Sequence, residues 1–167
     1  MALMAHYDSA TVEADENGHQ HITDGTSPGA SDDGYGVAAI VETLRALKAE
    51  GRQPENSLKI VITDAEEIGL IGARNEMRHH RADYENVDLV LNLEARGMSG
   101  PAFMFETSPN NSAVAGYFLN HVKQPVTGSL LPSLYALMPN GTDMNVLIPK
   151  GFTVLNIAAI GEADHYH

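Results

Sequence analysis

Five short segments of this 167-residue sequence carry histidines or carboxylates. They are HYDS with His6 and Asp8, SDDGYG with Asp32 and Asp33, TDAEEIGL with Glu66 and Glu67, NLEARG with Glu94, and the closing DHYH with His165 and His167. Imidazole nitrogens and carboxylate oxygens are typical ligands of zinc and similar divalent ions, and one carboxylate can bridge two ions. Of two adjacent glutamates, one could bind metal while the other moves protons. These residue types predict a metal-dependent hydrolytic site.

Each segment also has a purely structural interpretation when it is considered alone. The histidine and aspartate of HYDS could be a polar pair at a strand end, and the closing histidines could belong to a frayed terminus. The aspartates of SDDGYG suit a helix N-cap, the paired glutamates suit a solvated first turn, and Glu94 could form a surface ion pair with Arg96. The combination favours the metal site, because residues at the carboxyl ends of parallel strands converge in space.

The pattern of apolar residues predicts the elements that position these side chains. Four near-continuous apolar runs, at 2–5, 58–63, 87–93 and 153–160, indicate strands buried on both faces, with a further strand at 102–106 along a sheet edge. Helical spacing predicts helices at 36–50, from about 68 to 80, at 112–122 and at 143–149. The polar segment 11–31 and the proline-containing segment 123–140 read as irregular. This alternation predicts an α/β fold, a three-layer αβα sandwich with a mostly parallel central sheet.

Composition narrows the classes of function. Ten Lys and Arg against 22 Asp and Glu give a net charge of −12, which argues against a nucleic-acid-binding protein. The absence of cysteine excludes thiol catalysis and cysteine-ligated zinc. No apolar run reaches the roughly 18 residues of a membrane helix, so we expect no membrane contact from this chain.

The five segments, in this order, resemble peptidase family M28, the zinc aminopeptidases, over nearly the whole chain from Met4 to His167. The NLEARG–SGP–FET stretch is most similar to the membrane-associated branch, which includes vacuolar and endoplasmic-reticulum metallopeptidases and bacterial relatives. The resemblance implies one catalytic domain over residues 1–167, a core without the flanking segments that family members carry at both ends. It also implies that the full-length protein is extracytoplasmic or membrane-associated.

The resemblance further implies two zinc ions per chain and a hydroxide between them that attacks a peptide carbonyl. Asp32 would bridge the ions, Glu66 would be the general base and acid, and Asp8 would hold the second imidazole nitrogen of a histidine ligand. The remaining ligands would be His6 and Glu94 for the first ion, and Glu67 and His167 for the second. Tyr135 or Asn140 would supply the hydrogen-bond donor to the tetrahedral intermediate.

Departures from the family pattern accompany these matches. Tyr35 stands where relatives have a small residue, and this changes the packing next to the metal ligands. His167 is the last residue and is expected to fray, so the second site would be partly occupied or completed by a neighbouring molecule.

The leading interpretation is an aminopeptidase that acts on peptide substrates. The alternatives are glutaminyl cyclisation or hydrolysis of N-acyl amino acids on the same fold, and a non-catalytic receptor or scaffold domain. A sheet edge left open by missing strands also predicts a homodimer.

Overall fold

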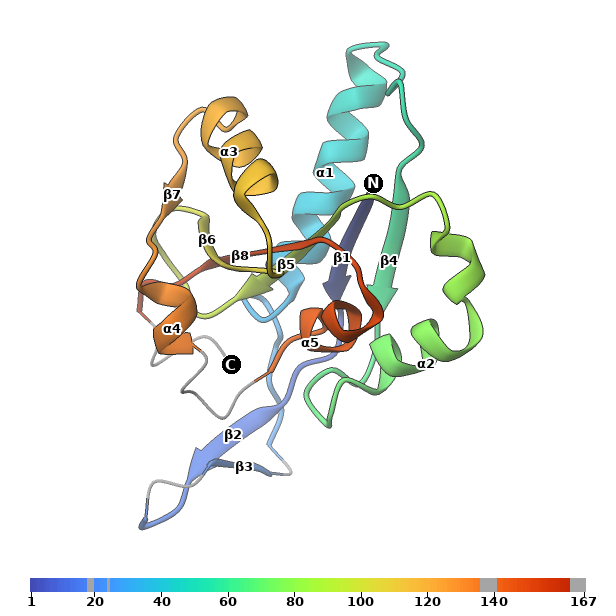
Figure 1. The fold of residues 1–167 in the computed structure, drawn as a ribbon. Helices are drawn as coiled ribbons and strands as arrows, with labels where there is room; N and C mark the ends of the chain where they lie inside the picture. The colour runs from blue at the N-terminus through green and yellow to red at the C-terminus, as the bar shows by residue number, and fades with distance from the viewer. Residues whose placement is uncertain (18–19, 24, 136–140, 163–167) are drawn as a thin grey trace.

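The computed structural model describes residues 1–17, 20–23, 25–135 and 141–162. Its central sheet has six strands in the order β4-β1-β5-β8-β6-β7 (Figure 1). The strands are β1 (Ala2–His6), β4 (Lys59–Thr63), β5 (Val90–Ala95), β6 (Phe103–Thr107), β7 (Val126–Thr127) and β8 (Val154–Ala159). Every neighbouring pair is parallel except β6 with β8. The predicted mostly parallel sheet is confirmed.

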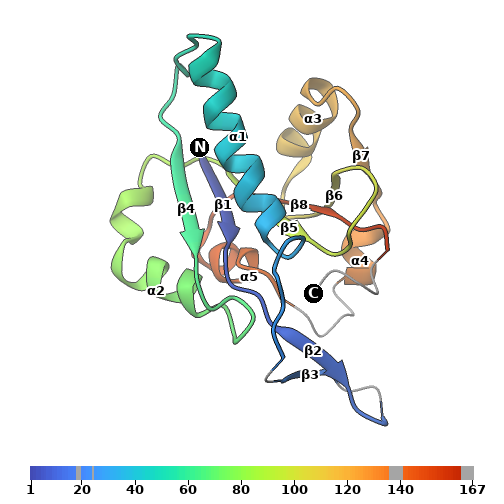
Figure 2. The ribbon, with the colours of Figure 1, turned by 180° about the vertical axis from the view of Figure 1, so that it is seen from behind.

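Helices cover both faces of the sheet, as Figures 1 and 2 show from opposite sides. One layer contains α1 (Gly34–Ala49) and α3 (Ser112–His121), and the other contains α2 (Ile71–His79), α4 (Leu131–Tyr135) and α5 (Met144–Leu147). Two short 3-10 turns, η1 (Arg81–Tyr84) and η2 (Ile148–Lys150), follow α2 and α5. The molecule is therefore the predicted three-layer α/β sandwich.

Strand β1 shows why the predicted strands read as continuous apolar runs. Leu3 and Ala5 pack toward Ile40 of α1, whereas Met4 packs on the opposite face in the core that includes Met144 of α5. All five residues of β1 are buried. Because both faces meet helices, neither face of the strand can be polar until the strand ends at His6.

The segment 11–31, predicted to be irregular, contains a hairpin of β2 (Thr11–Ala14) and β3 (Gln20–Thr23) that projects from the carboxyl end of the sheet (Figure 1). The prediction failed because alternation in sequence reflects burial of one face, and this hairpin stands apart from the core. Ile22, for example, is 46% exposed.

Other elements also differ from the predictions. Segment 123–140 is not wholly irregular, because β7 and α4 lie within it, and β7 rather than β6 is the sheet edge. Pro132 is tolerated at the start of α4, where a helix leaves backbone N–H groups unpaired. Helix α2 begins at Ile71 rather than near 68, because Leu70 adopts a left-handed conformation with φ of 59°. The helix predicted at 143–149 is α5 followed by η2.

None of the helices in the described ranges has the length and apolar character needed to cross a bilayer.

Candidate metal centre

His6, Asp32 and Glu94 meet at the carboxyl end of the sheet. His6 ends β1, Glu94 lies near the end of β5, and Asp32 precedes α1. His6 Nε2 lies 3.0 Å from Asp32 Oδ1 and 3.7 Å from Glu94 Oε2. All three residues are at most 3% exposed. The structure thus brings together three of the predicted ligands, which come from segments far apart in the sequence.

The donor set and its spacing fit a zinc ion. One ligand atom from each of these residues lies within 4.8 Å of the other two. A tetrahedral ion with ligands at about 2.0–2.1 Å requires neighbouring ligand atoms about 3.3 Å apart. The separations of 3.0 Å between His6 Nε2 and Asp32 Oδ1 and of 3.7 Å between His6 Nε2 and Glu94 Oε2 fall on either side of that value.

Asp8 connects the histidine to the segment that carries the paired glutamates. Its carboxylate accepts the backbone N–H groups of Glu66 and Glu67, with oxygen–nitrogen distances of 3.0 and 3.2 Å. The second imidazole nitrogen of His6, Nδ1, lies 2.9 Å from the backbone oxygen of Asp8 and 3.5 Å from its carboxylate. Asp8 therefore contacts His6 through both its main chain and its side chain.

The two adjacent aspartates face different partners. Asp33 is the N-cap of α1, where its carboxylate accepts the N–H of Gly36 at 2.9 Å, and it also lies 3.3 Å from the N–H of His6. Asp32 instead faces the imidazole. The structural interpretation of this pair as a helix cap thus holds for Asp33, and the ligand interpretation is available to Asp32.

Glu66 and Glu67 are not solvated carboxylates in a first helical turn. They precede α2, and Glu66 is only 8% exposed. Burial, with a smaller effect of the Glu94 carboxylate, raises the pKa of Glu66 to about 9. Burial, with a smaller effect of Asp32, raises the pKa of Glu67 to about 7. Both glutamates lie where a neighbouring cation would favour their ionised forms.

The charge around His6 is strongly negative. Burial alone would lower the pKa of the imidazole, but its hydrogen bonds with Asp32 and Glu94 raise that pKa to about 12. Burial and Glu94 raise the pKa of the neighbouring Asp33 to about 9. A centre with several buried carboxyl groups and one imidazole is stabilised by positive charge, which a divalent ion supplies.

Sequence reasoning missed a row of buried polar residues behind Glu94. Asn92 Nδ2 donates to Glu94 Oε1 at 3.3 Å and to Asn156 Oδ1 at 3.0 Å. Asn156 Nδ2 then donates to Thr142 Oγ1 at 2.9 Å. The two asparagines are register partners on β5 and β8. Each interrupts an apolar strand, VLNLEA or VLNIAA, and that shared interruption was the available signal.

A second missed residue, Asp143, lies between α5 and the sheet. It is 1% exposed and accepts the hydroxyl of Thr63 at 2.5 Å. The sequence pattern indicates only that Asp143 starts a helix, because nothing in the sequence marks which aspartates become buried.

Arg96 contacts Tyr135, rather than forming the surface ion pair with Glu94 that one interpretation suggested. Arg96 Nη2 donates to the Tyr135 hydroxyl at 2.8 Å and to the carbonyl oxygen of Gly141 at 3.0 Å. Burial raises the pKa of Tyr135 above its usual range. The other predicted donor, Asn140, and the predicted ligand His167 lie outside the described residues.

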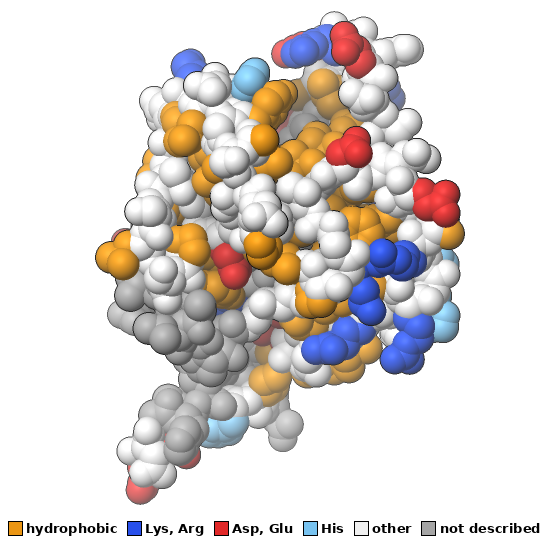
Figure 3. Space-filling view, viewed as in Figure 1, with side chains coloured by type: hydrophobic (Ala, Val, Ile, Leu, Met, Phe, Trp, Pro, Cys, Tyr) orange, Lys and Arg blue, Asp and Glu red, His pale blue; other side chains and the backbone are white. Residues whose placement is uncertain are grey.

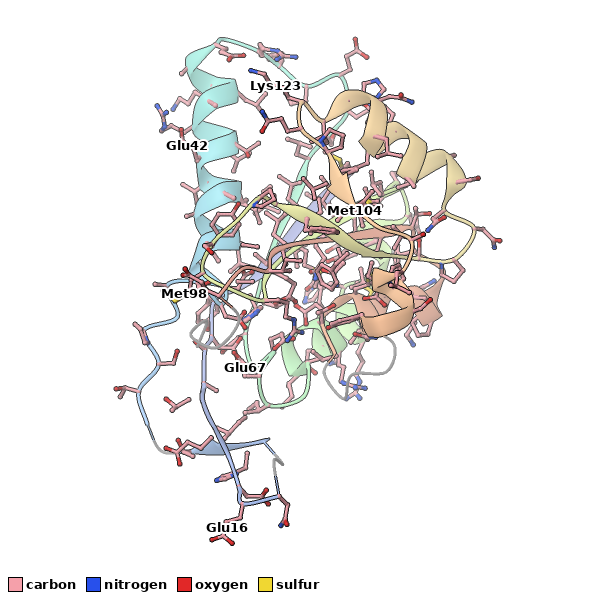
Figure 4. All side chains as sticks on the ribbon, turned by 90° about the vertical axis from the view of Figure 1, so that its left-hand side faces the viewer. Glu16, Glu42, Glu67, Met98, Met104 and Lys123 are labelled. Atoms are coloured by element: carbon pink, nitrogen blue, oxygen red, sulfur yellow. The ribbon has the colours of Figure 1, made fainter. Side chains whose placement is uncertain are left out.

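The candidate ligands and the candidate base that the structure describes, namely His6, Asp32, Glu66, Glu67 and Glu94, lie at one end of the central sheet. In Figure 4, Glu67 lies on the same side of the sheet as the hairpin tip with Glu16, and Lys123 lies at the opposite end. This is the end at which β1, β4 and β5 terminate, where open α/β sheets place their sites.

Comparison with known proteins identifies relatives of this chain. The vacuolar membrane protease of Lodderomyces elongisporus is 33% identical over 144 residues, 85% of this chain and 14% of the relative. That of Candida dubliniensis is 29% identical over all of this chain and 16% of the relative. This chain thus spans only about one-seventh of the curated relatives it matches.

Solved structures share the fold. The LapA aminopeptidase of Legionella pneumophila superposes with a TM-score of 0.65 at 18% identity, over 99% of this chain and 40% of LapA. LapB of the same organism superposes with a TM-score of 0.63 at 18% identity, over 98% of this chain and 41% of LapB. The profile of Peptidase family M28 matches residues 1–167. The chain belongs to peptidase family M28.

Proposed function

We propose that this chain is the catalytic domain of a zinc-dependent aminopeptidase that removes the N-terminal residue of a peptide. The observation that carries the proposal is the buried meeting of His6 Nε2 with one oxygen each of Asp32 and Glu94. Family membership and the aminopeptidase fold of LapA support a peptidase. The proposal treats residues 1–167 as a single domain.

Two zinc ions would be held by overlapping sets of residues. His6 and Glu94 would hold the first, Glu67 and His167 the second, and Asp32 would bridge them. Both His6 and Glu94 are at most 2% exposed, so the first set of ligands is buried in the protein. When bound, the ions polarise the scissile carbonyl and lower the pKa of bound water.

Glu66 is our candidate for the group that moves the proton. It lies next to the Glu67 ligand and is held by the hydrogen bond from its own N–H to Asp8. Its carboxyl pKa, raised by burial, places it among groups that can accept and return a proton near neutral pH once cations lie nearby. Glu66 would take a proton from the attacking water and deliver it to the leaving amine.

Substitution of Glu66 by glutamine tests this assignment. Glu66→Gln retains the size of the side chain and removes its basicity, so we expect turnover of an aminoacyl p-nitroanilide to fall about 10²–10⁴-fold while zinc content per chain is unchanged. Glu16→Gln, in the exposed hairpin, is the matched control and should retain activity. Unchanged turnover in Glu66→Gln would refute its role.

The same assay separates the alternative reactions. An aminopeptidase should cleave the p-nitroanilide only when its α-amine is free. Preferential cleavage of the N-acetylated substrate would indicate an N-acyl amino acid hydrolase, and cyclisation of an N-terminal glutamine would indicate a cyclase. A chain that binds zinc and turns over none of these substrates would fit a receptor or scaffold domain.

We also propose that the longer protein is membrane-associated, as the names of the vacuolar membrane proteases suggest. A homodimer of the domain would use the outer edge of β4, which pairs only with β1 among the described strands. Ile60 and Ile62 on this strand are 36% and 40% exposed. Light scattering should give the mass of two chains, and a monomer at high concentration would contradict the dimer.

A further inference from the structure

Four of the ten Lys and Arg residues gather on one face of this acidic protein. They are Arg74 and Arg78 on α2, Arg81 on η1 and Lys150 at the end of η2, and all four are exposed. Figure 3 shows the blue side chains grouped over this part of the molecule. We call this group the basic face.

The basic face lacks the carboxylate partners that Arg45, Arg52 and Lys59 have. Arg45 pairs with Glu42, and Lys59 lies 3.4 Å from Glu76. Among the described residues, no carboxylate lies within 4.0 Å of any cation of the basic face. Unpaired like charges side by side, such as Arg74 and Arg78 four residues apart on one helix, repel each other. The arrangement is therefore unfavourable until an anion lies between the charges.

The surface between these cations is hollowed. Arg74, Arg78 and Lys150 line a hollow of about 370 Å³ together with Met77, Val146 and Pro149. Lys150 also lines a second hollow of about 510 Å³, with Arg81 and Phe152. The two hollows adjoin, since both include Lys150 and Arg81 Nη2 donates to the carbonyl oxygen of Lys150 at 3.0 Å.

The shape of this surface selects among anions. A compact phosphate would contact only the cations of one hollow, whereas the charges here are spread along two. The lining also contains apolar side chains, including Val146 and Phe152, which suit the side chains of a peptide and not a phosphate group. Glu85 in the second hollow is the one carboxylate among the lining residues.

We propose that the basic face is a docking site for an extended acidic peptide segment of a partner protein. Carboxylates of the segment pair with Arg74, Arg78, Arg81 and Lys150, and its apolar side chains occupy the two hollows. The two hollows share no lining residue with the candidate metal centre, and the proposal does not depend on the proposed peptidase activity.

Binding of a defined probe tests this site. The probe is a dye-labelled short peptide of glutamates and leucines, acetylated at its N-terminus and amidated at its C-terminus, so that an aminopeptidase has no free amine to act on. Fluorescence anisotropy should show saturable binding that weakens with salt and is unchanged by EDTA. The matched peptide with glutamine in place of each glutamate should not bind.

Paired variants locate the binding. The double variant Arg78→Gln with Lys150→Gln should weaken binding at least about tenfold, because each cation contacts the peptide directly. Arg52→Gln with Lys123→Gln removes the same net charge elsewhere and should have little effect. Equal weakening in both double variants would show only general electrostatic attraction and overturn the site.

Three other outcomes would also overturn the proposal. The first is the absence of saturable binding. The second is loss of binding on addition of EDTA, which would place the peptide at the metal centre. The third is tripolyphosphate binding, abolished by Arg78→Gln with Lys150→Gln, when the peptide itself does not bind; the surface would then serve phosphate groups.

Discussion

Asp8 accepts a hydrogen bond from the backbone N–H of Glu66, with 3.0 Å between Oδ1 and N, although 58 residues separate them in the sequence. The bond joins the end of β1 to the turn that follows β4. It fixes the main chain on which the candidate base is mounted, while the same aspartate contacts His6. One side chain thus contacts both the candidate metal ligand His6 and the main chain of the candidate base Glu66.

Asp8→Asn tests that coupling. Asparagine retains one acceptor oxygen but loses the charge and one of two acceptors for the N–H groups of Glu66 and Glu67. We expect zinc affinity to fall about 10–100-fold and the free energy of unfolding to fall by about 1–2 kcal/mol. Competition with a chelator and urea unfolding measure the two effects. Asp88→Asn, on the exposed surface, should change neither; unaltered zinc affinity in Asp8→Asn would contradict the role of Asp8.

Asn92→Leu tests the polar row behind Glu94. The change removes the donor to Glu94 and leaves Asn156 Oδ1 buried without this hydrogen bond. The free energy of unfolding should fall by about 1–3 kcal/mol, and zinc affinity should fall because one ligand loses its support. Asn86→Leu, at an exposed position, should stay within about 0.5 kcal/mol of the parent chain. Equal free energies of unfolding in the two variants would contradict a stabilising role for the hydrogen bonds of Asn92.

Asp143 should make stability depend on pH in a defined direction. Burial raises the pKa of its carboxyl from 3.8 to about 6, although the hydrogen bond from Thr63 acts to lower it. Since the folded state binds this proton more tightly than the unfolded state, the contribution is complete below pH 3.8 and is lost as pH rises through about 6. In urea unfolding with EDTA present, the free energy of unfolding should fall less steeply with pH over this range in Asp143→Asn than in the parent chain. Identical slopes would contradict the raised pKa.

Gly36→Ala tests the packing of the Asp33 cap. A Cβ atom at Gly36 would lie 2.5 Å from both carboxylate oxygens of Asp33, so the cap would have to shift. We expect destabilisation of about 1–3 kcal/mol despite the better helix propensity of alanine. Gly116→Ala in α3 is the matched control, since its Cβ meets nothing within 4 Å, and it should stabilise by about 0.5–1 kcal/mol. Thermal unfolding that shifts the same way in both variants would contradict the steric argument.

Tyr135→Phe tests the predicted hydrogen-bond donor. Because the Tyr135 hydroxyl accepts from Arg96, its own proton is available to a substrate oxygen. If the hydroxyl stabilises the tetrahedral intermediate, kcat should fall about 10²–10³-fold with zinc content unchanged. A fall confined to thermal stability would instead indicate a structural role. Tyr117→Phe, on the exposed surface of α3, controls for the loss of a hydroxyl.

The sequence predicted the elements that are buried in the sheet. Strands such as β1 and β8 are covered on both faces, so their composition alone identifies them. The hairpin of β2 and β3 was missed because the segment is polar and exposed. The short elements β7 and α4 were missed because the prolines of segment 123–140 indicated irregular structure. The pattern of apolar residues therefore predicts an element when that element is buried, and it fails for elements that are exposed.

Some residues of the candidate site could be predicted from the sequence, and others could not. Asp32 and Glu94 were identifiable because acidic residues follow strands or precede a helix at characteristic positions. The sequence did not indicate which of Asp32 and Asp33 faces His6 and which caps α1, because either aspartate could form the cap. The structure places Asp32 against His6 and Asp33 at the cap. The roles of Asn92 and Asp143 depend on partners across the sheet, Asn156 and Thr63, which no local pattern specifies.

The parallel arrangement of β1, β4 and β5 also has a kinetic consequence. His6 and Glu94 become neighbours only after the chain between residues 6 and 94 has closed large loops through its helical crossovers. Loop closure of this kind costs entropy before any contact compensates for it, and parallel pairing is correspondingly slow. We therefore expect the centre to assemble late in folding, and we expect a bound ion to act chiefly by slowing unfolding.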